Sequence, residues 1–360
     1  MAPEGDWEVD YFIISTTTQD SHTDRLYANG LMQVPVVVTL GAIDKKTSES
    51  YPLQDSDLDK IELYDFENAD QVLTGDGDWS ILSARNPTFA SSIEIDVGGT
   101  SDAPKETSPA RAQVLGAINT SFRTKLFWVS SKVVGSKRIA ARVRQPDNTL
   151  VKTQYSVYNS NVKINAIEPI VYTVDNINVA REDTGNGNFN YYTQNEENDN
   201  WYVSAKTFDQ DNYYVTSKLH RFVLAEVEGH DKTGYGEGHP GDWRLANCYG
   251  YYSKDGKTLR LSFIWGLDVE TKTTAGLYRR ANIKGRDGTV GRAADGFVNM
   301  TVNQRPNAVC LTRLALDAPE AIWGENWSAE STTFTVYDVY GNSGKFTAGF
   351  NADHNLVAIS

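Results

Sequence analysis

The densest set of side chains that could bind a metal ion lies in the glycine-rich stretch 229–243. His230 and His239 are nine residues apart, and Glu237 lies between them. Imidazole nitrogens and carboxylate oxygens are ligands of zinc and related ions. We therefore take His230, Glu237 and His239 as candidate metal ligands. Their spacing matches no zinc signature, so a plain connecting loop and a ligand-binding loop are the alternatives.

Three acidic segments permit a surface calcium ion, and we expect no other cofactor. The segment 55–60 has aspartates at alternate positions, as at the start of a calcium loop. It then departs from that pattern, with Lys60 where glycine is needed and Phe66 where glutamate is needed. We expect 55–60 to cap a short helix and the segments 75–78 and 209–211 to form acidic turns.

Covalent catalysis finds no support in the sequence. There is no Gly-x-Ser-x-Gly motif, and neither Cys248 nor Cys310 has a histidine in a recognisable local arrangement. The glycine-rich segment 285–292 matches neither a dinucleotide fingerprint nor a P-loop. We predict that the protein is not an enzyme. The two cysteines are expected either to form one disulfide or to be buried free thiols.

Aromatic residues with polar neighbours are the strongest candidates for contacts with a partner. Flat aromatic faces beside Asn and Asp suit either a protein interface or a sugar ring, whereas packing inside the fold is the alternative. The 19 tyrosines outnumber the 13 phenylalanines, which favours surfaces that are apolar yet hydrated. The candidates are Trp201, Tyr202, Tyr213, Tyr214, Tyr235, Trp243, Trp323 and Trp327.

The charge balance restricts the partners. The chain has 34 basic and 47 acidic residues, a formal net charge of −13, which disfavours nucleic acid and anionic membranes. No apolar run approaches the roughly 18 residues of a membrane span, so we expect no transmembrane segment. No signal peptide is visible at the N-terminus. We expect synthesis in the cytoplasm, with release by lysis or by a dedicated secretion route as further alternatives.

Hydrophobic residues alternate with period two along most of the chain, which predicts strands. Pro35 within the strand-like run 32–40 indicates an edge strand or a bulge. Turn residues between alternating runs predict hairpins. The predicted strands and hairpins cover 9–15, 32–40, 139–153, 249–265, 334–350 and 356–359, and Leu259, Leu261, Phe263 and Trp265 are expected to face one core. Only 57–63 and 109–118 are candidate helices.

These elements predict an all-β protein of tandem β-sandwich, immunoglobulin-like domains, with short helices only in connections. The predicted divisions are an N-terminal sandwich over 1–98, a linker over 99–109, a middle sandwich over 110–185 and a larger C-terminal region over 186–360. The recurring strand–turn–strand units resemble the tandem immunoglobulin-like modules of bacterial surface proteins. That resemblance concerns the fold and implies no function.

Taken together, the sequence predicts a non-catalytic structural or interaction protein that self-associates as a homo-oligomer or filament. The strand-like runs 9–15 and 356–359, near the two termini, are expected to contribute edges to that assembly. The alternative is a toxin-like or carbohydrate-binding protein that acts on a glycan or protein of a host or cell surface. Sedimentation at two concentrations and a glycan-binding assay distinguish the two hypotheses.

Overall fold

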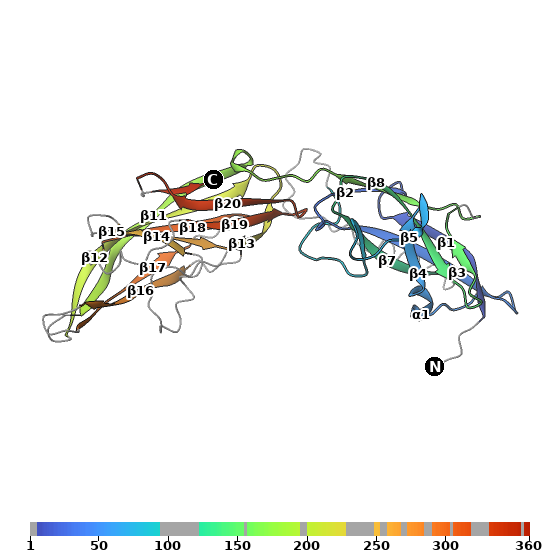
Figure 1. The fold of residues 1–360 in the computed structure, drawn as a ribbon, viewed down its shortest axis with the longest axis horizontal. Helices are drawn as coiled ribbons and strands as arrows, with labels where there is room; N and C mark the ends of the chain where they lie inside the picture. Colours follow the sequence, from blue (N-terminus) through green and yellow to red (C-terminus); the bar gives the residue numbers. More distant parts are fainter. Residues whose placement is uncertain are drawn as a thin grey trace. The chain divides into compact units, whose positions relative to one another are not determined.

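We describe the fold from a computed structural model of the chain. The structure describes residues 6–93, 122–154, 157–194, 200–227, 248–252, 258–267, 272–283, 290–302, 305–317, 331–353 and 356–360, with the backbone alone for 248–252, 272–283, 290–295 and 297. The protein is all-β and consists of two compact units (Figure 1). Unit 1 comprises Met1–Ile170 with Val339–Asn342, and unit 2 comprises Val171–Asp338 with Ser343–Ser360.

Unit 1 is a sandwich of two sheets. Its strands are β1 (Trp7–Thr16), β2 (Thr23–Tyr27), β3 (Val34–Asp44), β4 (Ile61–Asp65), β5 (Asn68–Val72), β6 (Trp79–Leu82), β7 (Phe122–Ser131), β8 (Gly135–Arg144), β9 (Leu150–Lys152) and β10 (Val162–Ile167). One sheet has the order β1-β3-β7-β6, and the other has the order β2-β10-β8-β4-β5, with β9 beside β8. Both layers contribute to one core, as immunoglobulin-like folds require.

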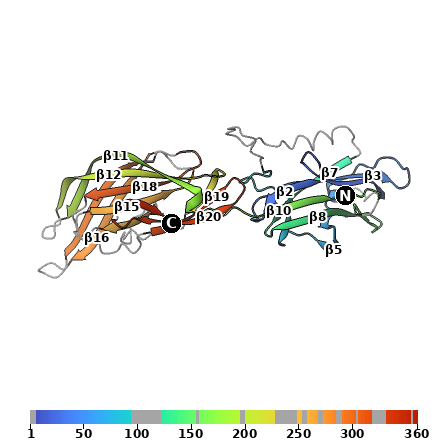
Figure 2. The same ribbon diagram turned by 90° about the horizontal axis from the view of Figure 1, so that it is seen from above.

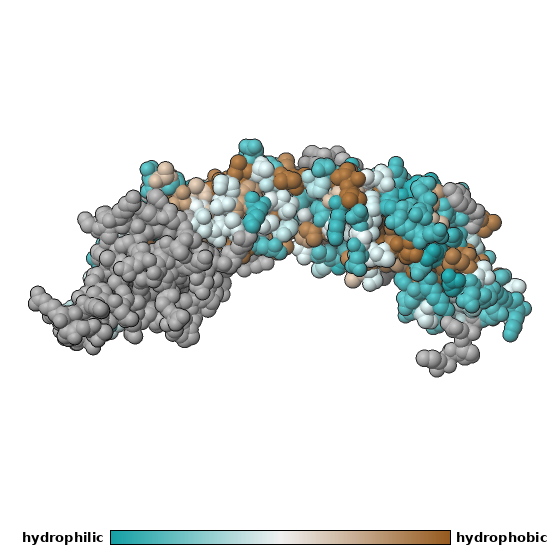
Figure 3. Space-filling model, in the orientation of Figure 1, coloured by the Kyte–Doolittle hydropathy of each residue, from teal (hydrophilic) through white to brown (hydrophobic). Residues whose placement is uncertain are grey.

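The core of unit 1 follows from the alternation in its strands. Val34, Val36, Val38 and Leu40 of β3 are fully buried on one face of the sheet. The expected edge position or bulge at Pro35 is wrong, because β3 lies between β1 and β7. The ladder with β1 ends at Val36, so Pro35 lies just beyond that pairing. On the face of unit 1 seen in Figure 3, hydrophilic side chains predominate over apolar ones.

The acidic segment 55–60 forms a cap, as expected. The helix α1 (Asp55–Leu58) begins where the Asp57 carboxylate accepts hydrogen bonds from the Gln54 amide (2.9 Å) and the Trp7 indole (3.1 Å). Asp55 and Asp59 pair with Arg123 and Lys125 at 2.5 and 3.2 Å. The helix predicted over 57–63 is wrong beyond Leu58, because residues from Ile61 join β4.

Unit 2 contains a seven-stranded and a four-stranded sheet. Its strands are β11 (Ile177–Gln194), β12 (Trp201–Ser217), β13 (Phe222–Val227), β14 (Cys248–Tyr252), β15 (Thr258–Trp265), β16 (Lys272–Ile283), β17 (Val290–Thr301), β18 (Val309–Asp317), β19 (Ser331–Asp338), β20 (Ser343–Phe350) and β21 (Val357–Ile359). A 3-10 helix, η1 (Val174–Asn176), precedes β11. The sheet orders are β14-β15-β18-β12-β11-β17-β16 and β13-β19-β20-β21.

The predicted hairpins are confirmed: β8 pairs with β9, β14 with β15, and β19 with β20. The four residues expected to face one core on β15 do share a face. Leu259, Leu261 and Phe263 are buried there, and Trp265 is partly buried. The other face of β15 is buried as well, at Ser262 and Ile264. This strand therefore lies inside the sandwich rather than on its surface.

The predicted domain boundaries are wrong. Unit 1 continues to Ile170, so the described residues of 110–185 are divided between the two units and form no separate sandwich. The reason is long-range pairing: β7 pairs with β3, and β8 pairs with β4, so residues 122–144 complete the sheets begun by the N-terminal strands. The predicted linker 99–109 and helix 109–118 lie outside the described residues.

Candidate interaction site

Unit 2 carries a long two-stranded ribbon formed by β11 and β12. The two strands pair continuously from Ile177 opposite Ser217 to Gln194 opposite Trp201, with one bulge near Gly185. Figures 1 and 2 both show them side by side along their length. On its other side, β12 pairs with β18, and that pairing begins only at Phe208. Within the described residues, no strand pairs with Val203–Thr207 on that side, and we call this segment the open edge.

The side chains at the start of β12 are exposed although three of them are large and apolar. Trp201 is 44% exposed, Tyr202 52% and Val203 60%. Ser204 and Ala205 are exposed as well. Successive side chains of a strand point to opposite faces. Side chains on both faces of β12 are therefore exposed at this point, where a strand of a sandwich normally has one buried face.

The opposite side of the ribbon is held by β17. Tyr191–Thr193 of β11 pair with Ala294–Gly296. Phe189 and Tyr191 are buried there and meet edge to face, with ring centroids 6.3 Å apart. Gly296 permits this close approach, because a Cβ atom at that position would lie 3.0 Å from the Phe189 ring. The ribbon is thus fixed along one side.

Two buried amides at the base of the ribbon bind the end of β17. The Gln210 side chain donates to the Thr301 carbonyl (2.7 Å) and accepts from the Thr301 amide (3.1 Å). Asn212 donates to the same carbonyl at 2.8 Å and accepts from Thr312 at 2.7 Å. Trp265 in turn donates to Thr312 at 2.9 Å. The Gln210 and Asn212 side chains thus make the hydrogen bonds to the backbone of Thr301 that a neighbouring strand would otherwise make, and they hold the end of β17 beside β12.

The other face of the same base contains a buried charge network. Asp211 is fully buried, and Arg313, directly opposite on β18, is 2% exposed. The Arg313 guanidinium donates to Asp211 through Nε (2.8 Å) and also through Nη2, and Nη2 donates to Asp209 at 2.5 Å. The Arg181 guanidinium lies 2.9 Å from the second Asp211 oxygen as an ion pair. Two positive and two negative groups thus neutralise one another.

The structure divides the predicted aromatic residues into three groups. Trp201 and Tyr202 are exposed, as a partner-binding role requires. Tyr213 and Tyr214 are 5% and 1% exposed, so their prediction as partner-binding residues is wrong. Tyr235, Trp243, Trp323 and Trp327 lie outside the described residues.

Tyr214 is part of a packed contact in the core. The Arg305 guanidinium lies 3.8 Å from the centre of the Tyr214 ring, and its Nη2 pairs with Glu182 at 2.7 Å. The guanidinium covers the face of the buried Tyr214 ring, whereas the Arg305 side chain itself remains 47% exposed. For Tyr213, burial and then the charge of Asp211 raise the pKa of the hydroxyl. The polar neighbours of both tyrosines in the sequence belong to the interior.

The metal predictions have different outcomes. His230, Glu237 and His239 lie outside the described residues. The expected acidic turn at 209–211 is wrong, because Asp209 and Asp211 lie within β12 and bind Arg313. In the part of the chain that the structure describes, no three His, Cys, Asp or Glu side chains gather as a metal site would require.

Cys310 is a free, buried cysteine, so the disulfide alternative is wrong. Burial raises the pKa of its thiol to about 12. Because the thiolate is the nucleophilic form, this thiol is unreactive near neutral pH. No helix of the described chain is long and apolar enough to span a membrane.

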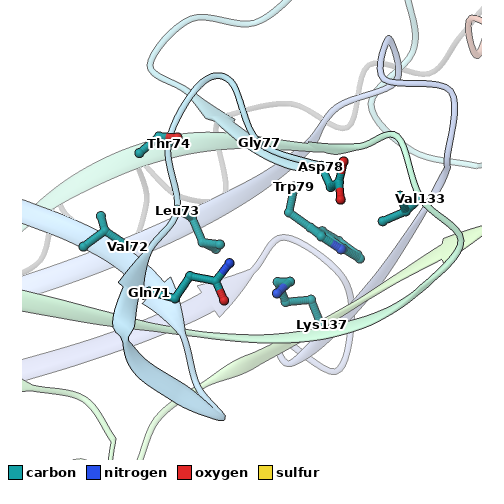
Figure 4. A pocket seen from close by; sticks show the side chains of 9 residues that line it. All are labelled: Gln71, Val72, Leu73, Thr74, Gly77, Asp78, Trp79, Val133 and Lys137. Carbon is teal, nitrogen blue, oxygen red and sulfur yellow. The ribbon is translucent and has the colours of Figure 1, made fainter.

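Unit 1 has a hollow of about 380 Å³ between the end of β5, the start of β6 and the start of β8. Figure 4 shows Gln71, Trp79 and Lys137 among the side chains around it. Trp79 is 8% exposed, and Lys137 pairs with Asp65 at 2.6 Å. The cation in this hollow is therefore already neutralised, and the indole face is mostly covered.

The sequence did not single out Val203 or the open edge. One signal was available: residues 200–205 contain no charge and no proline, the two features that normally protect an edge strand.

Comparisons with known proteins give no family. No protein-family model matches the chain, and a comparison with curated proteins finds no relative. Nine chains of solved structures match. One is named BspA_C_WT; it has 8% identity and a TM-score of 0.20, and the match covers 92% of this chain and 97% of that chain. Another is the C-terminal domain of the Streptococcus agalactiae AgI/II polypeptide BspA, with 8% identity and a TM-score of 0.20, covering 93% of this chain and 97% of that chain.

A further match is the C-terminal domain of the Streptococcus pyogenes antigen I/II-family protein AspA, with 8% identity and a TM-score of 0.21, covering 93% of this chain and 96% of that chain. TM-scores near 0.2 do not demonstrate a common fold, so these similarities add nothing to the geometry described above.

Proposed function

We propose that this chain is a non-catalytic interaction protein that self-associates through the open edge of β12. The single observation that carries the proposal is a strand segment, Val203–Thr207, that no described strand pairs with on this side, beside the exposed side chains of Trp201 and Val203. A strand with unpaired backbone groups is a template for another strand. The occupant is the same edge of a second copy.

The length of the free segment determines how two copies pair. In each copy, β18 occupies the β12 edge from Phe208 onward. We take the two-fold axis to pass through Ser204, where residues 201–207 of the two antiparallel copies overlap. That register places Val203 opposite Ala205 and Trp201 opposite Thr207. Large side chains then face small or β-branched ones, which suits cross-strand packing.

Charge supports the same occupant. The net charge of −13 opposes contact between copies over most of the surface, whereas the paired segment contains only one charge, Lys206. With the axis at Ser204, the two Lys206 residues do not face each other. The contact is small, so the association is weak and depends on protein concentration.

The two edge strands nearest the termini, β1 and β21, suit this role less well. The outer edge of β1 is covered by side chains of its own unit: Gln145 accepts from the Val9 amide (2.8 Å), and Tyr158 donates to the Val9 carbonyl (3.2 Å). Ser160 bonds both the amide and the carbonyl of Ile14, at 3.0 and 2.9 Å. β21, the edge strand near the C-terminus, has three residues.

The geometry favours a protein partner over a sugar. Trp201 and Tyr202 are adjacent in an extended strand, so their rings point to opposite faces and do not form one platform for a sugar ring. A polypeptide edge uses both faces of the strand at once.

Charge exchange tests the proposal. We expect the wild type to associate in sedimentation velocity as its concentration rises. Val203→Lys with Ala205→Lys places lysines opposite each other across the axis, and Val203→Glu with Ala205→Glu does the same with glutamates. Each double variant should be monomeric, and an equimolar mixture should associate. Leu219→Lys is the matched control, since Leu219 is 54% exposed in the same unit but lies outside the edge.

A wild type that stays monomeric at high micromolar concentration would contradict the proposal. Association of the double lysine variant to the wild-type extent would show that another surface forms the contact.

A further inference from the structure

Three buried hydrogen-bond donors of unit 2 have no acceptor. They are Nε of Arg260, Oγ of Ser262 and Nη1 of Arg313, and nothing among the described residues bonds these atoms. Ser262 is fully buried, and Arg313 is 2% exposed. A buried donor without an acceptor is costly, so native structures leave few of them. The proposed function of the β12 edge makes no use of these three groups.

Strand pairing places the three donors together on one face of the seven-stranded sheet. Ser262 of β15 lies directly opposite Arg313 of β18, and Arg260 lies two residues before Ser262 on the same face. The Cβ atoms of directly opposite residues are about 4.5–5.5 Å apart, and those of residues two apart along a strand are about 7 Å apart. The three donors therefore form a triangle around one small region of the sheet.

The neighbouring positions connect this region to solvent. Ala315 of β18 lies opposite Arg260 on one side and opposite Asp209 of β12 on the other. Arg260 and Ala315 are partly exposed, and the Asp209 side chain is 49% exposed. The side chain of Ala315 is a single methyl group, so it fills little of the space beside the donors. This is the direction from which a small ion reaches them.

Arg260 also lacks a counter-ion. The carboxylates of Asp209 and Asp211 on the same face are bound by other arginines. Asp317, diagonally across from Arg260 at the exposed end of β18, forms no ion pair with it, and neither does any other group in the described part of the chain. A guanidinium with a buried nitrogen and no negative partner is unfavourable, and a bound anion removes that cost.

We infer that unit 2 binds a tetrahedral oxyanion, phosphate, between Arg260, Ser262 and Arg313. A water molecule accepts only two hydrogen bonds and leaves the charge of Arg260 uncompensated. The oxygens of phosphate accept from all three donors and also supply the negative charge. Three oxygens of a tetrahedral anion face a triangle of donors, whereas a carboxylate presents two oxygens in one plane. Guanidinium groups are well suited to phosphate for the same reason.

The experiment uses the full chain, with inorganic phosphate as the probe and sodium chloride of equal ionic strength as the reference. At pH 7.5, we expect 10 mM phosphate to raise the unfolding temperature of unit 2 by about 3–5 °C, as for a ligand at about ten times its dissociation constant. Hydrogen exchange in residues 258–265 and 309–317 should slow. Acetate at the same concentration should do neither, because it has only two oxygens.

Three variants locate the effect. Arg260→Gln should weaken phosphate binding about tenfold or more, because a charged donor is lost at a partly exposed position where the variant folds normally. Ser262→Ala, which removes a single oxygen atom, should weaken binding about three- to tenfold. Arg221→Gln is the matched control, since Arg221 is an exposed arginine of the same unit outside this face, and it should bind phosphate as the wild type does.

The absence of a phosphate effect in the wild type would overturn the inference, and so would wild-type phosphate binding by Arg260→Gln. An acetate effect equal to that of phosphate would overturn the assignment of a tetrahedral anion. None of these outcomes bears on self-association through the β12 edge, which is measured by sedimentation.

Discussion

Replacing Arg313 by methionine should strongly destabilise unit 2. Arg313 supplies both hydrogen bonds that β18 gives to the buried Asp211, and its removal leaves that carboxylate with the half-exposed Arg181 alone. Breaking a buried ion pair by removing one partner costs about 3–5 kcal/mol, because the remaining charge stays desolvated.

The double replacement Arg313→Met with Asp211→Leu should be milder than either single change. It removes both buried charges together. It also removes Arg313 Nη1, which has no hydrogen-bond partner among the described residues. Replacing a buried pair by apolar side chains is often close to neutral. We therefore expect a coupling of more than about 2 kcal/mol in the double-mutant cycle. Asp209→Asn is the matched control: Asp209 is half exposed, so its loss should cost less than about 1 kcal/mol.

The assay is hydrogen exchange of peptides covering 208–215 and 309–317, which reports the opening of these strands rather than of unit 1. A cost below about 1 kcal/mol for Arg313→Met would refute the reasoning, as would additive single and double changes.

Three further changes test the packing and the titration. Leu261→Ala, in the interior of unit 2, should cost about 2–4 kcal/mol in denaturant unfolding, and a cost below about 1 kcal/mol would show that its face was misassigned. Ser262→Ala should leave stability unchanged or raise it slightly, because the buried hydroxyl has no hydrogen-bond partner among the described residues; a clear loss would contradict this. The stability of unit 1 should rise as pH falls from about 7 to about 4. Burial raises the folded pKa of Asp24 from its usual 3.8 to about 6, so the native state binds the proton more tightly. Asp24→Asn should remove that part of the pH profile, and an unchanged profile would contradict the assignment.

Local strand pairs could be predicted from the sequence because their signals are local. The hairpin between β14 and β15 follows from alternating residues around an Asp-Gly pair. The hairpin between β8 and β9 follows from alternating residues on either side of the turn residues 145–148. The pairing of β7 with β3 joins segments about 90 residues apart. No local turn specifies it, and the domain boundaries therefore could not be predicted.

The candidate site shows the same limit. Tyr213 and Tyr214 were expected at the surface because Asp211 and Asn212 precede them. Those polar residues are fully buried, since Arg313 and the Thr301 carbonyl satisfy them from other strands. Exposure of Trp201 followed from its polar neighbours. The open edge beside it depends on where β18 begins to pair with β12, which the alternation along β12 does not reveal.

The most direct test of self-association is cross-linking through Ser204→Cys. A two-fold axis through this residue brings the two Cα atoms to about 4.5–5.5 Å, within the range for a disulfide. The variant is made with Cys248→Ser, since Cys310 is buried and unreactive near neutral pH. Under mild oxidation we expect a disulfide-linked dimer to form rapidly, and Leu219→Cys in the same background to remain largely monomeric. Equal and slow cross-linking of the two variants would contradict the proposed edge.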